Sequence, residues 1–254
     1  MRNVILFESD SHQFILLNES DPGEENGIRS NQYLIKHHAN GILLDPGGFN
    51  VMPQTLSELL RYLNPDSTQA IILSHQDPDI VAGIATWMEL IQAPIYISRI
   101  WIRFLPHYGI KDTSRFFGVP DVGMDCIFEN DFHLKIIPAH FLHSEGQMNV
   151  YDPVSKILFS GDIGAACLPD DQDYAFVDDF EKHLPFIESF HRRYMCGNKA
   201  ARAWVSNISK LDINMIAPQH GPIYRGQSVC DFINWFKNLR CGMDLMSSGG
   251  HFKE

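Results

Sequence analysis

The sequence has few positive charges and no run of lysine or arginine. Its 20 basic residues are outnumbered by 31 acidic ones, and the formal charge is −11. Nucleic acids and anionic membranes attract clustered positive charge, so neither is expected as a main partner. Long hydrophobic runs are also missing. The run at residues 4–7 is too short for a signal peptide or a membrane span, and acidic residues follow it at once.

Cysteine is scarce and irregularly spaced. The five cysteines are an odd number, and no two of them form a Cys-x-x-Cys pair. This pattern argues against a disulfide framework, a thiolate zinc site and a rubredoxin-type iron site. A reducing, cytoplasmic location is the simplest expectation. The cysteines are Cys126, Cys167, Cys196, Cys230 and Cys241.

Internal repeats, low-complexity stretches and linkers are absent from the 254 residues. The hydrophobic content of 44% and the charged content of 20% are ordinary for a folded protein. A chain of this length can bury a sizeable core. We therefore predict one domain that spans residues 1–254.

Apolar runs bounded by turn residues predict strands, and apolar residues at helical spacing predict helices, so an α/β fold is expected. Strands are predicted at residues 4–7, 13–17, 31–36, 41–45, 70–73, 95–98, 132–138, 148–151, 156–160 and 213–217. Helices are predicted at 52–63, from 81 to about 91, in segments within 100–117, and at 179–195, 198–210 and 228–239. A loop is predicted at 21–27, and a frayed tail from 247 onward.

Three side chains that can bind metal follow the predicted buried strand at 70–73. His75, Asp77 and Asp79 lie between this strand and the helix expected from residue 81. Loops in this position are where α/β folds usually place their chemistry. A polar turn, with Asp79 near the start of a helix, is the alternative interpretation.

Three further loops share this arrangement. His143, Asp162 and His220 each follow an apolar strand. Gly161 and Gly221, next to two of them, let the backbone approach a crowded centre. Three histidines and three aspartates together make a nitrogen and oxygen site. The set suits two close metal ions bridged by one carboxylate, and Asp162 is the expected bridge.

Other histidines are expected to have ordinary roles. The adjacent His37 and His38 point to opposite faces of a predicted hairpin, which favours surface positions over a metal site. His140 lies near His143 in the sequence, and a structural role is expected for it. The alternative is that His140 supports a metal ligand from behind.

The pattern resembles the metallo-β-lactamase superfamily over nearly the whole chain, from the segment at 31–35 to the segment at 220–225. The first loop, His75-x-Asp77-x-Asp79-Ile80, resembles the His-x-Glu-x-Asp loop of the flavodiiron branch. The segments Ser160-Gly161-Asp162 and His220-Gly221-Pro222 resemble the same branch. The resemblance implies an αββα sandwich, with two mixed β-sheets, helices on the outer faces and a two-metal site at the edge of the sheets.

The resemblance also assigns ligands. It implies His75, Asp77 and His143 on one iron, Asp79 and His220 on the other, and Asp162 between the two. Asp77 is one methylene shorter than the glutamate of the family, so its loop must come closer or bind differently. Ile80 stands where some relatives carry a further histidine ligand, so Ile80→His is expected to tighten the second position. Tyr194 resembles a tyrosine near the family's site and is a candidate catalytic residue that donates a hydrogen bond to bound oxygen, with core packing as the alternative.

The resemblance implies a stand-alone non-haem diiron protein with two Fe ions that binds O2, or NO, and senses or reduces it. The stretch after His220 is shorter than a flavodoxin of roughly 140 residues and has no phosphate loop, so no FMN is expected in this chain. Electrons would then come from a separate donor, or a signalling partner would read the site. Relatives pair as dimers that bring one subunit's flavin to the other's irons. Since no flavin is expected here, this reason for pairing is missing, and a homodimer remains one possibility. The alternative function is a binuclear zinc hydrolase of the same fold.

Overall fold

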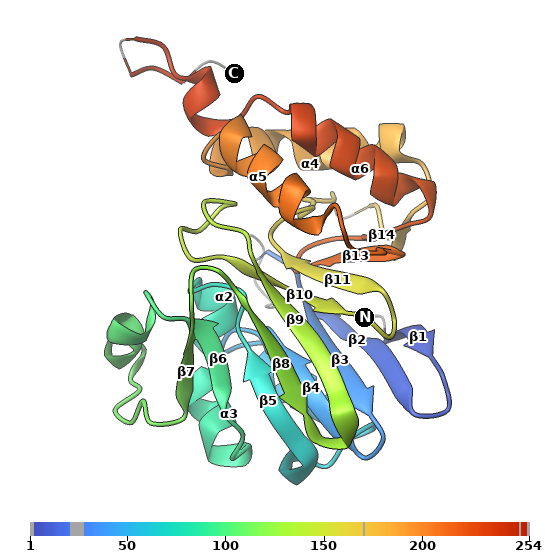
Figure 1. Ribbon diagram of the computed structural model, residues 1–254, viewed down its shortest axis with the longest axis vertical. Helices are drawn as coiled ribbons and strands as arrows, with labels where there is room; N and C mark the ends of the chain where they lie inside the picture. Colours follow the sequence, from blue (N-terminus) through green and yellow to red (C-terminus); the bar gives the residue numbers. More distant parts are fainter. Residues whose placement is uncertain (1–2, 21–27, 170, 249, 253–254) are drawn as a thin grey trace.

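A computed structural model describes residues 3–20, 28–169, 171–248 and 250–252. Two seven-stranded β-sheets face each other, and helices cover the outer face of each (Figure 1). The predicted αββα sandwich is thereby confirmed. The loop predicted at 21–27 lies outside the described residues.

The first sheet has its strands in sequence order. It begins as an antiparallel meander from β1 to β4, and β4 to β7 are parallel. Its strands are β1 (Val4–Glu8), β2 (His12–Ser20), β3 (Ser30–His37), β4 (Asn40–Leu44), β5 (Thr68–Ile72), β6 (Ile95–Ser98) and β7 (Phe116–Val119). The parallel part places the carboxyl ends of β4 and β5 at one edge of the sandwich.

The second sheet has the order β12-β14-β13-β11-β10-β9-β8 and is also mixed. Strands β8 to β11 are antiparallel, and β11 pairs parallel to β13. The strands are β8 (Met124–Phe128), β9 (Phe132–Pro138), β10 (Met148–Asp152), β11 (Ile157–Gly161), β12 (Phe176–Val177), β13 (Met215–Pro218) and β14 (Ile223–Arg225). Since β11 and β13 run parallel, the loops after them emerge side by side.

The helices form two layers. Figure 1 shows α4, α5 and α6 together over the second sheet, and α2 and α3 beside β5 and β6 of the first. The helices are α1 (Met52–Leu59), α2 (Pro78–Val81), α3 (Ile84–Leu90), α4 (Phe180–Tyr194), α5 (Asn198–Ile208) and α6 (Gln227–Asn238). Short 3-10 helices lie at η1 (Pro65–Ser67), η2 (Ile102–Tyr108), η3 (Glu129–Asp131) and η4 (Gly242–Leu245).

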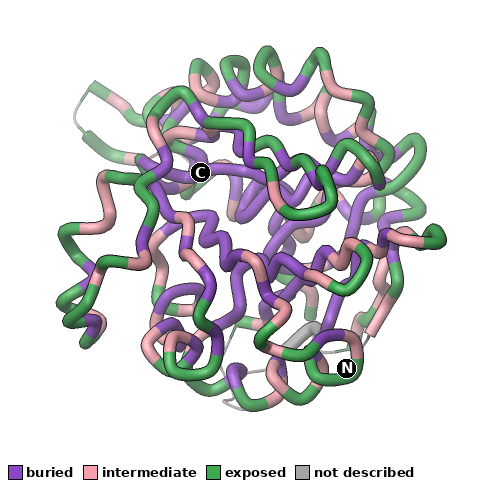
Figure 2. The backbone as a smooth tube through the Cα atoms, turned by 60° about the horizontal axis from the view of Figure 1, so that its bottom comes forward, coloured by how far each residue is buried: buried purple, intermediate pink, exposed green. Residues whose placement is uncertain are grey.

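Strand alternation divides the hydrophobic core into three layers. Along β5, Ile71 packs under the helices of the first sheet, and Ile72 packs between the sheets. The outer face of the second sheet packs against α4, α5 and α6, where Trp204 and Phe232 are buried. Figure 2 shows the buried interior in purple, with exposed segments concentrated in loops and on outer helix faces.

Several predicted boundaries differ from the structure. The helix predicted at 52–63 ends at Leu59, and the one predicted from 81 to about 91 is divided into α2 and α3. The break lies at Gly83, where an added Cβ would stand 2.7 Å from the Gly47 carbonyl oxygen. Strands β7, β8, β12 and β14 were not predicted. In the described part of the predicted frayed tail, Phe252 forms a β-bridge with Met246.

Among the described residues, no helix is both long enough and apolar enough to cross a membrane.

Candidate metal centre

Four loops bring the predicted ligands to one edge of the sandwich. His75 follows β5, His143 lies in the loop after β9, Asp162 follows β11 and His220 follows β13. The loops approach closely at Gly161, whose φ is +55° and where an added Cβ would lie 3.2 Å from the Ser74 side chain. The Met148 amide also donates to the Ser74 carbonyl at 3.0 Å, across the two sheets.

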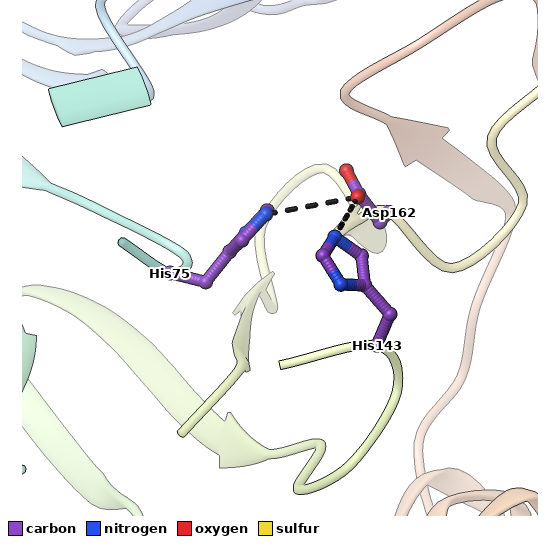
Figure 3. A group of neighbouring side chains, drawn as sticks. All are labelled: His75, His143 and Asp162. Carbon is purple, nitrogen blue, oxygen red and sulfur yellow. Dashed lines mark ion pairs between the residues drawn. The ribbon is translucent and has the colours of Figure 1, made fainter. Parts of the chain in front are cut away.

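Two histidines and two aspartates form the first half of the cluster. His143 Nε2 is 2.7 Å from Asp162 Oδ2 and 3.3 Å from Asp77 Oδ2. His75 Nε2 is 3.6 Å from each of these two oxygens. Figure 3 shows His75, His143 and Asp162 pointing toward one another from three separate segments. The ligand atoms of these three residues lie within 4.8 Å of one another, a spacing suited to one metal ion.

The other half of the cluster lies on the opposite oxygen of Asp162. His220 Nε2 is 3.5 Å from Asp162 Oδ1 and 3.3 Å from Asp79 Oδ2. Asp162 therefore faces His75 and His143 with one oxygen and His220 with the other. This is the arrangement of a carboxylate between two cations.

One atom at this centre has no hydrogen-bond partner. Asp162 is 3% exposed, and its Oδ1 accepts no hydrogen bond from any described residue. A buried carboxylate oxygen without a partner costs about 1–3 kcal/mol or more. A metal ion on the His220 side would satisfy this oxygen.

The charges of the cluster are strongly coupled. Burial disfavours the charged form of His143, but the hydrogen bonds that its ring donates to Asp162 and Asp77 outweigh burial and raise the pKa of His143 to about 10. Burial also opposes charge on His220, while Asp79 and Asp162 raise its pKa to about 9. Burial raises the pKa of Asp162, but the charges of His75 and His220 and the His143 hydrogen bond hold it at about 2. Without metal, protons on imidazoles therefore supply the positive charge that the carboxylates require.

A hydrogen-bond chain behind His75 sets its tautomer. The Ser74 hydroxyl donates to Asp45 Oδ2 at 2.5 Å, and the Ser74 amide donates to Asp45 Oδ1 at 2.7 Å. The same hydroxyl lies 2.9 Å from His75 Nδ1. Because its one proton goes to Asp45, it accepts from Nδ1–H, so that Nε2 points into the cluster and carries the lone pair whenever the ring is neutral, as a metal ligand must be. Burial raises the pKa of Asp45 to about 7, against the charge of His75 and the hydrogen bonds from Ser74.

His220 is oriented in the same manner. Its Nδ1 lies 2.7 Å from the Arg29 carbonyl, which can only accept, so Nε2 again faces the cluster with its lone pair. The side chain of Asn31 donates to the carbonyls of Pro218 and Gly221, on both sides of His220. Strand β3 of the first sheet thereby fixes a loop of the second.

Sequence reasoning missed the residues that support the ligands. These are Asp45, Ser74, Gln76, Ser144 and Gln219, and each contacts a ligand, its neighbour or its loop. Four of them, Ser74, Gln76, Ser144 and Gln219, are adjacent in sequence to a predicted histidine ligand. That adjacency was the available signal, although it cannot tell which way a side chain points.

Tyr194 lies at the site and outside the core. It is 57% exposed, stacks on Phe190 at 4.9 Å, and presents its ring to His143 at a centroid distance of 5.9 Å. The core-packing alternative is therefore wrong. Its role in catalysis stays a prediction.

Three other sequence predictions concern residues around the ligands. Ile80 is fully buried in the apolar core of the first sheet's helix layer, so a histidine there would have to leave that core to reach the metals. His140 braces its own loop through contacts with the carbonyls of Glu145 and Asp121. His38 is exposed as predicted, whereas His37 is half-buried and its Nδ1 lies 3.0 Å from Nδ1 of the buried His12.

A cavity of about 1340 Å³ lies over the cluster. Asp77, Asp79, His143, Asp162 and His220 form its floor. Its walls are largely apolar and aromatic, and include Ile28, Phe49, Val51, Phe190, Tyr194 and Phe252. A small uncharged molecule can therefore reach the cluster through surroundings that favour apolar ligands.

The donor set fits two iron ions. Three carboxylates offset most of the charge of two divalent cations. Imidazole is a common ligand of iron, and carboxylate oxygens suit hard cations. The unpartnered Asp162 oxygen and the oriented Nε2 atoms of His75 and His220 point to the same conclusion. The residues present therefore fit a two-metal centre.

Comparison with known proteins adds a family. A model of a family described as "ODP family beta lactamase" matches residues 28–221. The chain is similar to a solved structure described as the peroxy diiron species of chemotaxis sensor ODP, with 45% identity and a TM-score of 0.86. The match covers 95% of this chain and 97% of the other.

A second solved structure is described as the apo state of chemotaxis sensor ODP from T. denticola. It is 44% identical, with a TM-score of 0.84, over 96% of this chain and 97% of the other. A curated relative, diflavin flavoprotein A 1 of Synechocystis sp., is 26% identical over 211 residues, with 80% of this chain and 35% of that protein covered. The chain spans about half the length, or less, of the curated relatives it matches.

Proposed function

Because the chain belongs to the ODP family of the β-lactamase fold, we propose that it is a non-haem diiron protein whose ligand is O2. Two similar solved structures are described as forms of a chemotaxis sensor, one of them as a diiron species. The flavodiiron relatives support the same metal. Ferrous ions held by these residues would supply electrons and coordination positions for O2.

The observation that carries this proposal is the position of Asp162. One of its oxygens faces His75 and His143, and the other faces His220 and has no hydrogen-bond partner among the described residues. In the proposed assignment, His75, Asp77 and His143 hold one iron, Asp79 and His220 hold the other, and Asp162 bridges them.

The chain's own residues orient the imidazole ligands and line the cavity above them. The Ser74 hydroxyl and the Arg29 carbonyl fix the imidazoles of His75 and His220 so that each presents Nε2. Phe190 and Tyr194 form an aromatic wall of the cavity beside His143. The Tyr194 hydroxyl is the candidate hydrogen-bond donor to an oxygen ligand.

We further propose that the site senses O2 more than it consumes O2. Two ferrous ions offer two electrons, whereas reduction of O2 to water requires four, so turnover needs a separate donor. A slow return to the ferrous state would let a signalling partner read the oxidised centre. NO is the competing ligand. The same proposal holds that the chain folds as one domain, is located in the cytoplasm and forms a homodimer.

Anaerobic reconstitution tests the function. The metal-free protein is loaded with ferrous iron, the bound iron is counted, and absorbance spectra are recorded before and after a measured pulse of O2. We expect two irons per chain, an oxygen-dependent absorption change, and slow decay unless reductant is added. NO in place of O2 should give a different spectrum.

The contrary results are equally concrete. An unchanged spectrum after O2, with two irons bound, would rule out O2 as the ligand. Two zinc ions after growth with iron in excess, together with ester hydrolysis, would favour the zinc hydrolase.

A further inference from the structure

Gln76 lies between two of the proposed ligands, His75 and Asp77, and makes no contact of its own with the cluster's centre. Its side chain has two partners. Nε2 donates to Asp77 Oδ1 at 3.0 Å, and Oε1 accepts from the Ser144 hydroxyl at 2.6 Å. Its backbone carbonyl accepts from the Tyr108 hydroxyl at 2.7 Å. Three segments of the chain therefore meet at one residue.

The contact with Asp77 changes what that aspartate does. Asp77 occupies the N-cap of α2, where an aspartate side chain usually accepts from the helix's first amides. Here it makes no such capping hydrogen bond. Its Oδ1 instead accepts from Gln76, and its Oδ2 faces His143 at 3.3 Å. The amide thus turns a capping carboxylate toward the metal cluster.

The contact with Ser144 links a second ligand loop. Ser144 follows His143 and is buried, whereas Gln76 is half-buried. In the same loop, the His143 backbone amide donates to Gln147 Oε1 at 3.1 Å. A movement of the Asp77 loop would therefore move the His143 loop through the Gln76 side chain.

The other glutamine beside the cluster is arranged differently. Gln219 Nε2 donates to Asp79 Oδ2 at 3.1 Å, and this is the same oxygen that faces His220. Its own Oε1 is buried and has no hydrogen-bond partner in the described part of the chain. Gln76 leaves the cluster-facing oxygen of its aspartate free and is paired at both ends.

We propose that Gln76 is a positioning residue for the first metal position. Its side-chain Nε2 holds Asp77 Oδ1 so that Asp77 Oδ2 can serve as a ligand. Its side-chain Oε1 ties Asp77 to the loop of His143 through Ser144. This inference rests on the proposed function and names a residue outside the proposed ligand set. Partners behind metal ligands typically contribute roughly 10–100-fold to metal affinity.

The test uses Gln76→Leu, which keeps a similar volume and removes both hydrogen bonds. Binding of Co²⁺ to the metal-free protein is followed anaerobically by competition with a chelator and by the visible Co²⁺ spectrum. We expect one of the two binding steps to weaken by roughly 10–100-fold and its spectrum to change. Gln227→Leu is the matched control, because it removes a similar amide-to-carboxylate bond, to Asp231, on the distant α6.

Two further measurements separate positioning from folding. The metal-free Gln76→Leu protein should unfold at a denaturant concentration close to that of the Gln227→Leu protein. Ser144→Ala should weaken the same binding step by a smaller factor, and should add nothing in the Gln76→Leu background, because both changes act through one amide.

The inference is overturned if Gln76→Leu binds Co²⁺ as the wild type does, or if its loss of affinity is matched by an equal loss of metal-free stability. Additive effects of Gln76→Leu and Ser144→Ala would also overturn it. If the wild-type protein itself binds no pair of metals, the proposed function fails instead, so the two failures are distinguishable.

Discussion

Two pairs of histidines in this protein have pKa values that are shifted in opposite directions. Burial lowers the pKa of His183 and His191 to about 4. Burial also opposes charge on His143 and His220, yet their pKa values are raised to about 10 and 9. His143 is 18% exposed, but His220 is buried as His183 and His191 are, so neighbouring groups rather than burial set the direction of the pKa shift.

The neighbours of the first pair are neutral. His183 lies between the hydroxyls of Tyr174 and Tyr224, and His191 contacts the Ile187 carbonyl and accepts from the Gly164 amide. His143 and His220 instead face carboxylates. The comparison shows that the loop edge is built to hold positive charge, whereas the helix layer excludes it. Metal ions bound at the loop edge would supply the positive charge that protons supply in the metal-free protein.

Removing the central carboxylate should have the largest effect. In Asp162→Ala, both halves of the cluster lose the group between them, so both metals should be lost and the pKa values of His143 and His220 should fall toward those of His183 and His191. Metal analysis after reconstitution checks the first effect. Two metals still bound to a folded Asp162→Ala protein would mean that Asp162 is not the bridge.

Changing one carboxylate to an imidazole should alter metal preference. Asp77→His removes one negative charge from the first position and adds a nitrogen donor, which suits zinc better than iron. In competition between ferrous iron and zinc, the variant should retain a larger share of zinc than the wild type. An unchanged ratio would indicate that Asp77 is no ligand.

The raised pair predicts a loss of metal-free stability at alkaline pH. A raised folded pKa contributes stability that is complete below about 6.5, the unfolded value, and disappears as pH rises through about 9 to 10. Urea unfolding of the metal-free protein at pH 6.5, 8 and 10 should show this decline. The metal-loaded protein should show much less of it, because its histidines carry no proton to lose.

The lowered pair predicts the opposite slope at acidic pH. The unfolded chain takes up protons near pH 6.5, and the folded chain does not until about pH 4, so stability should fall as pH falls across that window. His191→Gln should flatten part of this slope. A slope equal to that of the wild type would mean that His191 is charged in the fold.

The smallest effect is expected at the exposed aromatic wall. Tyr194→Phe keeps the ring that faces His143 and removes the hydroxyl, so both metals should bind as in the wild type. The O2-dependent spectrum, or its rate of decay, should change if the hydroxyl donates to an oxygen ligand. Identical spectra and rates would end that assignment.

Much of the centre was predictable because its ligands follow continuous apolar strands. The runs before His75, Asp162 and His220 identify β5, β11 and β13, and metal-binding residue types then stand at their ends. Buried strands of this kind give a strong local signal. That signal marked the loops that carry the candidate ligands, whereas the family resemblance implied that these loops meet at the edge of the sheets.

Other features depend on tertiary contacts that leave no local pattern. β7 and β8 are short edge strands with mixed burial, so neither period stands out. The break between α2 and α3 depends on the approach of Gly47 to Gly83, far apart in sequence. The direction of the Gln76 and Asp45 side chains likewise depends on partners that only the folded chain brings near.

The account's central claim concerns two cations on either side of Asp162, and anomalous diffraction at the iron edge tests it most directly. Crystals of anaerobically reconstituted protein should give two strong peaks, one near Asp162 Oδ2 with His75 and His143, and one near Oδ1 with His220. A single peak, or peaks away from Asp162, would contradict it.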